Sequence, residues 1–393
     1  MTPLVATGMA LVTPLGRGVE PTWTNLRAGN HGLRPMDFED VRISTWIGRV
    51  DGLEDEALTG PWADFDCRNN RLAMLALREP GFANAVERIR RRYGAGRVAV
   101  FVGTTTSGIL ETEQAYRHRD PTGALPPLRY ARTQNLYSVT ELTRQVLRLG
   151  GPAFSISTAC SSSAKVFAAA ARVIAAGCCD AAVVGGVDSL CFMTLYGFAA
   201  LGLLSTDPCR PCDAERSGLT ISEAAGYVVL ERAGPAEGDV ALLGYGESSD
   251  AYHMSSPHPE GRGAVAAMQG ALGTAGLTAS DVDYVNLHGT GTHANDRAED
   301  VAVQRVFGGS TACSSTKGAT GHALGAAGIT EAVLSMQCLR DGFVPGTRQT
   351  RCVDQSFGSL VVLDDREIPL RAVMSNSFGF GGNNCSLIFG RHR

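Results

Sequence analysis

The sequence predicts a soluble α/β protein built from two similar halves, and three observations predict this class. The 393-residue chain is 44% hydrophobic and 19% charged, with 47 glycines, which suits a tightly packed core. Short apolar runs typical of strands alternate with segments typical of helices. Thr311–Lys317 and the small-residue helix at 323–339 echo Ser157–Ser163 and its own Ala-rich helix, which indicates an internal duplication into residues 1–236 and 237–393. A single echo also fits two unrelated buried helices.

The apolar runs and the turn residues between them predict the elements in order. An irregular segment is expected at 30–66 and a polar, Pro-rich loop at 117–128. The expected helices are residues 20–28, 69–77, 82–93, 134–149, the run after Ser161, and 323–339. The expected strands are residues 4–12, 97–102, 153–157, 181–187, 227–231, 282–287, 371–374 and 385–389.

Composition and the N-terminus exclude several classes of protein. The net charge of -4 shows no nucleic-acid signature. The chain has no run of about 18 apolar residues, so no membrane span is expected, and Met1–Gly8 does not read as a signal peptide. Eleven cysteines, an odd number in a large chain, do not form a disulfide framework and fit a reducing, cytoplasmic setting.

Cys160 stands where a predicted strand meets a predicted helix. The first turn of a helix exposes unpaired N–H groups and carries a partial positive charge. Such a position favours thiolate over thiol and predicts a nucleophile. The serines at 161–163 are expected to cap the helix and hold the turn. A small buried cysteine without chemistry fits this stretch equally well.

Two histidines and a lysine lie at the ends of elements in the C-terminal half. The apolar strand at 282–287 runs into His288, and ligand groups in α/β sheets gather at such ends. Lys317 and His322 lie in a Gly-rich turn that opens a helix. Because their neighbours are Gly and Ala, these two polar side chains are expected either to have hydrogen-bond or ion-pair partners or to take part in a reaction. The turn is not a P-loop, because the Gly-Lys-Ser/Thr order is missing. A structural role for either histidine stays open.

The turn Ser375–Asn384 alternates Gly and Phe between two predicted strands. Its backbone N–H groups can point at a ligand oxygen, as an oxyanion hole requires. Cys209 and Cys212 have the spacing of half a zinc site, but no second pair completes four ligands, so we favour a loop. A cysteine at a helix start, two histidines, a lysine and a Gly-rich turn together make a full set for acyl transfer.

On these residues the chain resembles the β-ketoacyl-(acyl carrier protein) synthases, the elongating condensing enzymes of fatty acid and type II polyketide synthesis. The resemblance runs from about Val5 to Ile388. Its motifs are specific in combination, and they are Thr158–Ser161, His288–Thr292, Lys317 with Thr320–His322, Gly325–Glu331 and Asn376–Gly382.

The resemblance implies the thiolase fold, with duplicated halves layered α-β-α-β-α and usually paired as a dimer. It implies that Cys160 carries the growing acyl chain as a thioester. His288 and His322 would handle decarboxylation of the malonyl extender, with Lys317 and Glu331 ordering His322. The backbone N–H groups of Cys160 and Phe380 would form the oxyanion hole, and Phe380 would be a gate that moves on acylation.

The resemblance also implies substrate contacts. Thr290 and Thr292 would contact phosphopantetheine, Phe378 and Gly381 would contact substrate from the Gly-rich turn, and Thr106 would form the floor of the acyl pocket. The substrates would arrive on the phosphopantetheine of an acyl carrier protein, so neither a cofactor nor a metal is expected.

Some features bear on the carrier and on the pocket. Arg68 and Arg71 are the candidate carrier-docking residues, although an ordinary solvated helix explains them equally well. The family usually has Thr where this chain has Asn383, and a bulky Ile is frequent at the position of Thr106. The segment Leu204–Arg210 is shorter than usual, which bears on the carrier contacts.

Alternative functions are a non-catalytic chain-length partner subunit and a degradative thiolase. The former lacks the nucleophile, so Cys160 argues against it. The latter would need a second cysteine in the final Gly-rich motif, and Cys385 lies beyond it. Among condensing enzymes, housekeeping fatty acid elongation and a specialised polyketide or aryl polyene pathway both stay open, with Thr106 and the short chain favouring the second. A homodimer and a heterodimer with a chain-length-factor-like subunit both stay open as well.

Overall fold

The computed structural model describes residues 1–232 and 240–391, and ten strands of its twelve-stranded sheet form two five-stranded arrays. The first array has the order β6-β5-β7-β9-β1 and the second β12-β11-β16-β17-β10. The strands of the first are β1 (Leu4–Thr13), β5 (Val98–Gly103), β6 (Ala153–Ile156), β7 (Ala181–Asp188) and β9 (Ala224–Arg232). Those of the second are β10 (Val240–Ser249), β11 (Tyr284–Asn286), β12 (Ala312–Ser314), β16 (Ala372–Gly379) and β17 (Asn383–Arg391).

The two arrays repeat one pairing pattern. In the first, β6-β5 and β5-β7 are parallel, and β7-β9 and β9-β1 are antiparallel. In the second, β12-β11 and β11-β16 are parallel, and β16-β17 and β17-β10 are antiparallel. β1 and β10 join the arrays by a short antiparallel pairing at Leu4 and Val5. The repeat supports the duplication, although the expected boundary at 236/237 lies outside the described residues.

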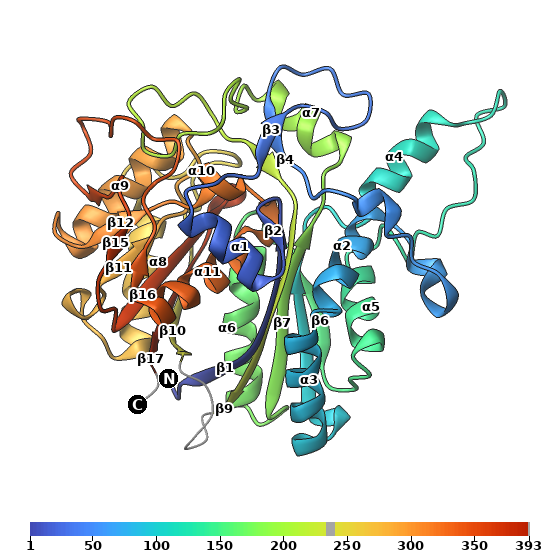
Figure 1. The fold of residues 1–393 in the computed structure, drawn as a ribbon, viewed down its shortest axis with the longest axis horizontal. Helices are drawn as coiled ribbons and strands as arrows, with labels where there is room; N and C mark the ends of the chain where they lie inside the picture. Colours follow the sequence, from blue (N-terminus) through green and yellow to red (C-terminus); the bar gives the residue numbers. More distant parts are fainter. Residues whose placement is uncertain (233–239, 392–393) are drawn as a thin grey trace.

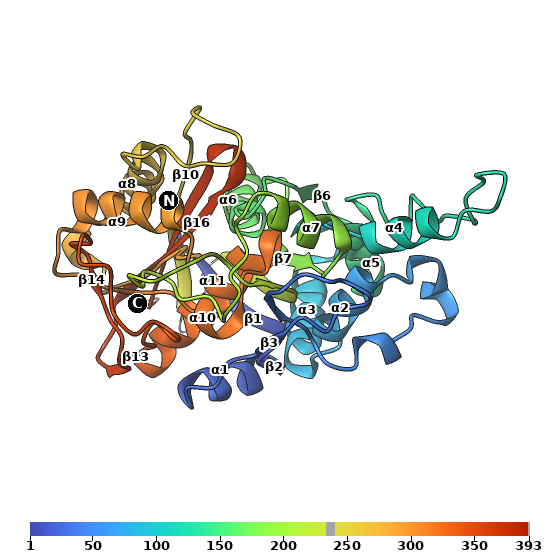
Figure 2. The ribbon, with the colours of Figure 1, turned by 90° about the horizontal axis from the view of Figure 1, so that it is seen from above.

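Helices and sheets alternate in five layers (Figure 1). The outer layers are α2 (Arg68–Leu77), α3 (Pro80–Tyr93) and α5 (Ser138–Val146) on the first array, and α8 (Arg262–Ala275) and α9 (His293–Phe307) on the second. The middle layer is α6 (Ser162–Ala175) and α11 (Ala327–Asp341), which contact both arrays. Seen from above, the N-terminal half lies mostly to the right and the C-terminal half to the left (Figure 2). The thiolase-type α/β fold is confirmed.

The middle helices pack closely because their contact residues are small. A Cβ atom on Gly328 of α11 would lie 2.5 Å from the backbone nitrogen of Ala164 in α6, so only glycine fits there. Both helices are poor in bulky side chains and buried along most of their length. Their contact lies within the largest hydrophobic core, which both arrays share.

The remaining elements are short or peripheral. The expected helix at 134–149 is shorter, as α5, because residues 118–137 form an extended segment that projects from the body after α4 (Ile109–Arg117) (Figure 1). None of the described helices is long and apolar enough to cross a membrane. The other elements are α1 (Val19–Arg27), α7 (Phe192–Ala200), α10 (Lys317–Thr320), β2 (Gly16–Arg17), β3 (Leu33–Pro35), β4 (Trp46–Gly48), β8 (Ile221–Ser222), β13 (Phe343–Val344), β14 (Leu360–Val361), β15 (Arg366–Glu367) and six 3-10 turns.

The close helix contact makes a prediction about stability. Gly328→Ala should lower the free energy of unfolding by about 1–3 kcal/mol, because the added methyl group forces α6 and α11 apart in a packed core. Thermal unfolding would measure the change. Gly270→Ala, at a half-buried helical glycine whose nearest added contact is 3.3 Å, is the matched control and should change stability far less. Equal losses in both variants would contradict the packing argument.

Candidate active site

The turn before α6 presents Cys160 between the two halves. Ala159, just before it, has a φ of 51°, in the left-handed region. The hydroxyl of Ser161 donates to the carbonyl of Thr158 at 2.8 Å, and the N–H of Thr158 donates to the hydroxyl of Ser162 at 2.9 Å. The serines therefore hold the strained turn, as expected. They do not cap the helix, because the N-cap Ser161 makes no side-chain capping bond.

Burial governs the acidity of the Cys160 thiol. The residue is 6% exposed, and burial raises its pKa to about 12, although Lys317 and the N–H of Phe380 act in the opposite direction. The expectation of a preformed thiolate at a helix start is therefore wrong for this structure. Cys160 precedes the helix, which starts at Ser162, and desolvation outweighs the favourable charges. The thiol needs a base at the moment of reaction.

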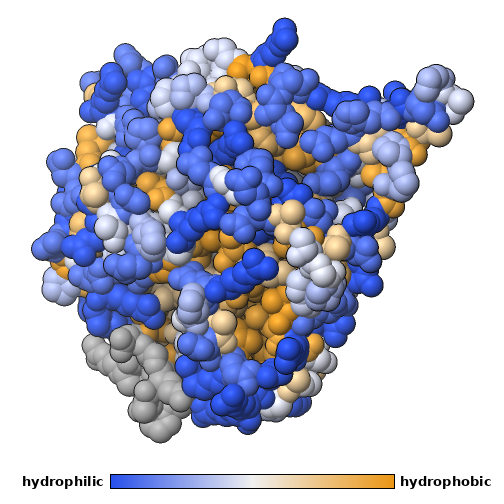
Figure 3. Space-filling model, turned by 45° about the vertical axis from the view of Figure 1, so that its right-hand side comes forward, coloured by the Kyte–Doolittle hydropathy of each residue, from blue (hydrophilic) through white to orange (hydrophobic). Residues whose placement is uncertain are grey.

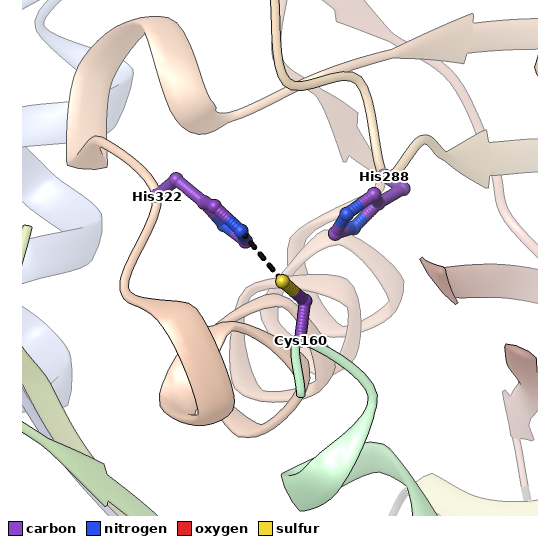
Figure 4. A group of neighbouring side chains, drawn as sticks. All are labelled: Cys160, His288 and His322. Carbon is purple, nitrogen blue, oxygen red and sulfur yellow. Dashed lines mark hydrogen bonds between the residues drawn. The ribbon is translucent and has the colours of Figure 1, made fainter. Parts of the chain in front are cut away.

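His322 supplies a base in contact with the thiol. Its Nε2 atom lies 3.0 Å from Sγ of Cys160, as Figure 4 shows. The main chain of His322 is held on both sides, since its N–H donates to Thr220 and its carbonyl accepts from Ser222. Burial and the charge of Lys317 lower the pKa of His322 well below its usual value, so the ring is neutral and can accept a proton.

His288 faces the same space from the end of β11. Its ring centroid lies 5.3 Å from that of His322, nearly at right angles to it (Figure 4). Burial, followed by the charges of Lys317 and His322, lowers the pKa of His288 well below its usual value. The carboxylate of Glu299 accepts the N–H groups of His288 and Gly289, both at 2.8 Å, and so fixes the loop. The sequence signal for Glu299 was its place at the start of the helix after this loop.

Lys317 contacts His288, whereas the sequence motifs predict that it orders His322. Its Nζ atom lies 3.3 Å from Nδ1 of His288, donates to the carbonyl of the same residue, and forms an ion pair with Glu331. The side chain of Lys317 reaches toward the end of β11, where His288 stands, while Nδ1 of His322 has no hydrogen-bond partner among the described residues. Burial raises the pKa of Glu331 to about 7, against the effect of Lys317.

The three candidate reacting side chains have the spacing of metal ligands, but their protons are arranged unfavourably for a metal. One donor atom from each of Cys160, His288 and His322 lies within 4.8 Å of the others. Lys317 carries three N–H donors and no acceptor, so Nδ1 of His288 accepts from it and the ring proton sits on Nε2. That proton makes Nε2 a hydrogen-bond donor toward substrate and removes the lone pair that a metal would need. Cys209 and Cys212 form no cluster either, since Cys209 donates to the carbonyl of Lys317 and Cys212 packs in the core.

The Gly-rich turn after β16 brings backbone donors to the thiol. The N–H of Phe380 points to Cys160, where it lowers the pKa of the thiol. A Cβ atom on Gly379 would lie 3.1 Å from the nitrogen of Cys160, so the two segments are in close contact. The two N–H groups are therefore near enough to serve one oxyanion. The ring of Phe380 stacks on Phe198 of α7 at a centroid distance of 5.4 Å.

A cavity of about 180 Å³ connects these groups to the surface. Phe378, Thr290 and Thr292 line it, and the two threonine hydroxyls share a hydrogen bond of 2.9 Å. Their roles toward substrate stay predictions. Gly381 is absent from the cavity lining, and its N–H donates to the carbonyl of Met254, so nothing in the structure adds support to its predicted substrate contact.

Thr106 does not form the floor of this cavity. It is fully buried, and its hydroxyl donates to Asp188 at 3.0 Å and accepts the N–H of Ser189 at 3.1 Å. The structure does not support the predicted floor position, because the threonine is absent from the cavity lining and its hydroxyl is held by a buried carboxylate. Thr106 therefore no longer favours a specialised pathway.

The two arginines proposed for carrier docking are engaged internally. Arg68 is 6% exposed, and its guanidinium forms two hydrogen bonds with the buried Glu223, at 2.6 and 2.8 Å. The docking prediction is wrong for Arg68, because a buried cation cannot meet a partner. Arg71 is partly exposed and forms two hydrogen bonds with Asp66, at 2.7 and 2.8 Å. Its docking role stays a prediction.

A duplicated thiolase-type fold with a Cys-His-His site at its centre defines the condensing class of acyltransferases. The family model for the beta-ketoacyl synthase N-terminal domain matches residues 1–236, and the model for the C-terminal domain matches residues 240–351. The chain belongs to the beta-ketoacyl synthase family and catalyses condensation in fatty acid or polyketide synthesis.

Named relatives and solved structures are similar to this chain over almost its whole length. The 3-oxoacyl-[acyl-carrier-protein] synthase 2 of Rhizobium meliloti is 36% identical, over 99% of each chain. The ketosynthase ApeO of Xenorhabdus doucetiae, solved in complex with its chain length factor ApeC, is 38% identical with a TM-score of 0.90, over 100% of this chain and 98% of that one. The ishigamide ketosynthase/chain length factor is 29% identical with a TM-score of 0.92, over 100% of both.

The lowered histidine pKa values predict the pH profile. A group with a lowered pKa stays neutral below its ordinary value of 6.5, so malonyl decarboxylation should stay level as the pH falls from about 8 to about 6.5. Initial rates of carbon dioxide release across this range would test it. An acid limb centred at 6.5 or above that disappears in His288→Asn would contradict the electrostatic assignment.

Proposed function

We propose that the chain extends an acyl chain held on Cys160 by decarboxylative condensation with a malonyl group, both delivered on the phosphopantetheine of an acyl carrier protein. The contact between Nε2 of His322 and Sγ of Cys160, at 3.0 Å beside the N–H of Phe380, carries this proposal. It places a neutral base and an oxyanion donor on one nucleophile.

Loading begins with attack of Sγ of Cys160 on the thioester carbonyl of the acyl carrier. His322 accepts the thiol proton, and the N–H groups of Cys160 and Phe380 stabilise the oxyanion. The new carbon–sulfur bond forms as the bond to the pantetheine sulfur breaks, and the leaving thiolate takes the proton from His322. A neutral base is essential because burial raises the pKa of the thiol to about 12.

Extension uses the same histidines as donors. The malonyl carbon–carboxylate bond breaks, carbon dioxide leaves, and Nε2–H of His288 stabilises the enolate oxygen together with His322. Because Nδ1 of His322 has no partner among the described residues, the protein imposes neither tautomer, and this ring can accept a proton in one step and donate in the next. The enolate carbon then attacks the Cys160 thioester, the carbon–sulfur bond to Cys160 breaks, and the sulfur leaves as a thiolate that takes a proton from water.

No step of this mechanism uses a metal or a nucleotide. All eleven cysteines are free, which fits a reducing compartment, and we place the reaction in the cytoplasm. Cys385 is fully buried in β17, so it does not offer the second reactive cysteine of a thiolase.

Loading can be separated from decarboxylation by changing the nucleophile. Cys160→Ala should abolish acyl transfer to the protein and leave malonyl decarboxylation measurable, since His288 and His322 remain. Cys160→Gln should raise decarboxylation above the Ala variant by imitating the acylated state. Intact-protein mass spectrometry and carbon dioxide release provide the two readouts. Acyl groups still attached to the Ala variant would disprove the assignment of the nucleophile.

We further propose that a chain-length-factor-like subunit pairs along β6 in a specialised pathway. Two of the similar structures contain a chain length factor. β6 is an edge strand of the first array, and such edges pair readily with another chain. Its Phe154 is 39% exposed, and the segment projecting nearby carries exposed Leu125, Leu128 and Tyr130. Figure 3 shows apolar side chains in the notch between this projection and the body.

The edge-strand pairing can be tested with the proposed partner. Phe154→Glu should abolish co-purification with a coexpressed chain-length-factor-like subunit, because a charge would be buried in the interface. Phe154→Leu keeps an apolar contact and should retain the complex. Light scattering after size exclusion would also reveal a homodimer, which would replace the heterodimer in this proposal.

A further inference from the structure

Asp188 joins the turn after β5 to the segment of the C-terminal half that carries His322. It ends β7, is fully buried, and accepts six hydrogen bonds. Five come from the N–H or hydroxyl groups of Thr104, Thr105 and Thr106, in the turn after β5. The sixth comes from the N–H of Gly325, at 2.6 Å, in the C-terminal half.

The bond to Gly325 acts on the segment that carries His322. Gly325 follows His322 by three residues, and Leu324 between them has a φ of 50°. A left-handed conformation at a leucine persists only where the surroundings impose it. A Cβ atom on Gly325 would lie 2.8 Å from Oδ2 of Asp188, so glycine is required for this approach. Thr220 and Ser222 hold the backbone of His322 itself, and Asp188 holds the strained exit from it.

We propose that Asp188 is a positioning residue that keeps Nε2 of His322 in contact with the Cys160 thiol. The inference rests on the proposed roles of Cys160 and His322. Without the carboxylate, Leu324 can relax from its left-handed conformation, and the ring three residues before Gly325 moves away from Sγ. A shift of this kind, of about 1 Å, costs on the order of 100-fold in rate.

Asp188→Asn tests this contact selectively. An amide has one accepting and one donating end. With the amide nitrogen in place of Oδ1, it would face the N–H groups of both Thr105 and Thr106. With the nitrogen in place of Oδ2, it faces one N–H group, that of Gly325, because the hydroxyl of Thr105 can rotate to accept. The second orientation leaves the threonine turn bonded and repels the His322 segment.

Thr104→Val is the matched control. Thr104 is fully buried and donates to the same carboxylate at 2.8 Å, and valine keeps its shape without the hydroxyl. This substitution removes one bond to Asp188 and leaves the bond to Gly325 in place. Gly325→Ala pushes on the His322 segment from the other side and serves if Asp188→Asn does not fold.

Two measurements decide the inference. Asp188→Asn should lower kcat for condensation by about 10- to 100-fold with KM changed less than about 2-fold. The pH profile of Cys160 alkylation, read by mass spectrometry on the peptide that contains it, should change to resemble that of His322→Ala. Thr104→Val should keep both readouts close to wild type at a similar loss of thermal stability.

The inference is overturned if the alkylation profile of Asp188→Asn matches wild type, or if Thr104→Val changes kcat and the profile as much. Alkylation requires no acyl substrate. A wild-type protein that fails to condense but shows a His322-dependent profile would therefore count against the proposed function and leave the positioning role of Asp188 standing.

Discussion

The close packing of α6 against α11 brings the thiol of Cys160 and the imidazole of His322 together. Cys160 lies just before the first helix, and His322 precedes the second by one 3-10 turn (Leu324–Ala326). Small residues such as Ala164 and Gly328 bring these two helix starts together. Bulkier side chains at the contact would separate the thiol from the imidazole by more than a hydrogen bond allows. The duplicated arrays hold the pair of helices from both sides, so that the geometry depends on the whole fold.

Placing the site at the centre of the fold has an electrostatic consequence. Desolvation raises the pKa of Cys160 and lowers that of both histidines, so the site holds a thiol and neutral imidazoles. The buried cation of Lys317 is tolerated because Glu331 pairs with it. A neutral imidazole can accept the thiol proton and can also donate to a developing enolate. In a thiolate–imidazolium pair, the imidazole has already taken up the proton and cannot accept another.

Buried carboxylates with no contact to the cavity's reacting atoms hold the loops of the site. Glu299 binds two N–H groups at the end of β11, and Asp188 binds donors from both halves. A buried carboxylate must be satisfied by donors, so each one dictates the positions of several backbone groups at once. The same requirement explains why Thr106 turns toward Asp188 and why Arg68 turns toward Glu223.

The sequence by itself determined the α/β class, and it predicted the duplication and the candidate reacting residues. The candidate reacting residues stand at the ends of predicted elements, next to distinctive sequence motifs. They are Cys160, His288, His322 and Lys317. Such local patterns can be recognised in the sequence without the tertiary structure. Tertiary structure alone decided which histidine Lys317 contacts, whether the thiol is acidic, and whether Thr106 or Arg68 faces a ligand. Each of these depends on burial and on partners distant along the chain, because desolvation and hydrogen-bond satisfaction arise only when the two halves meet.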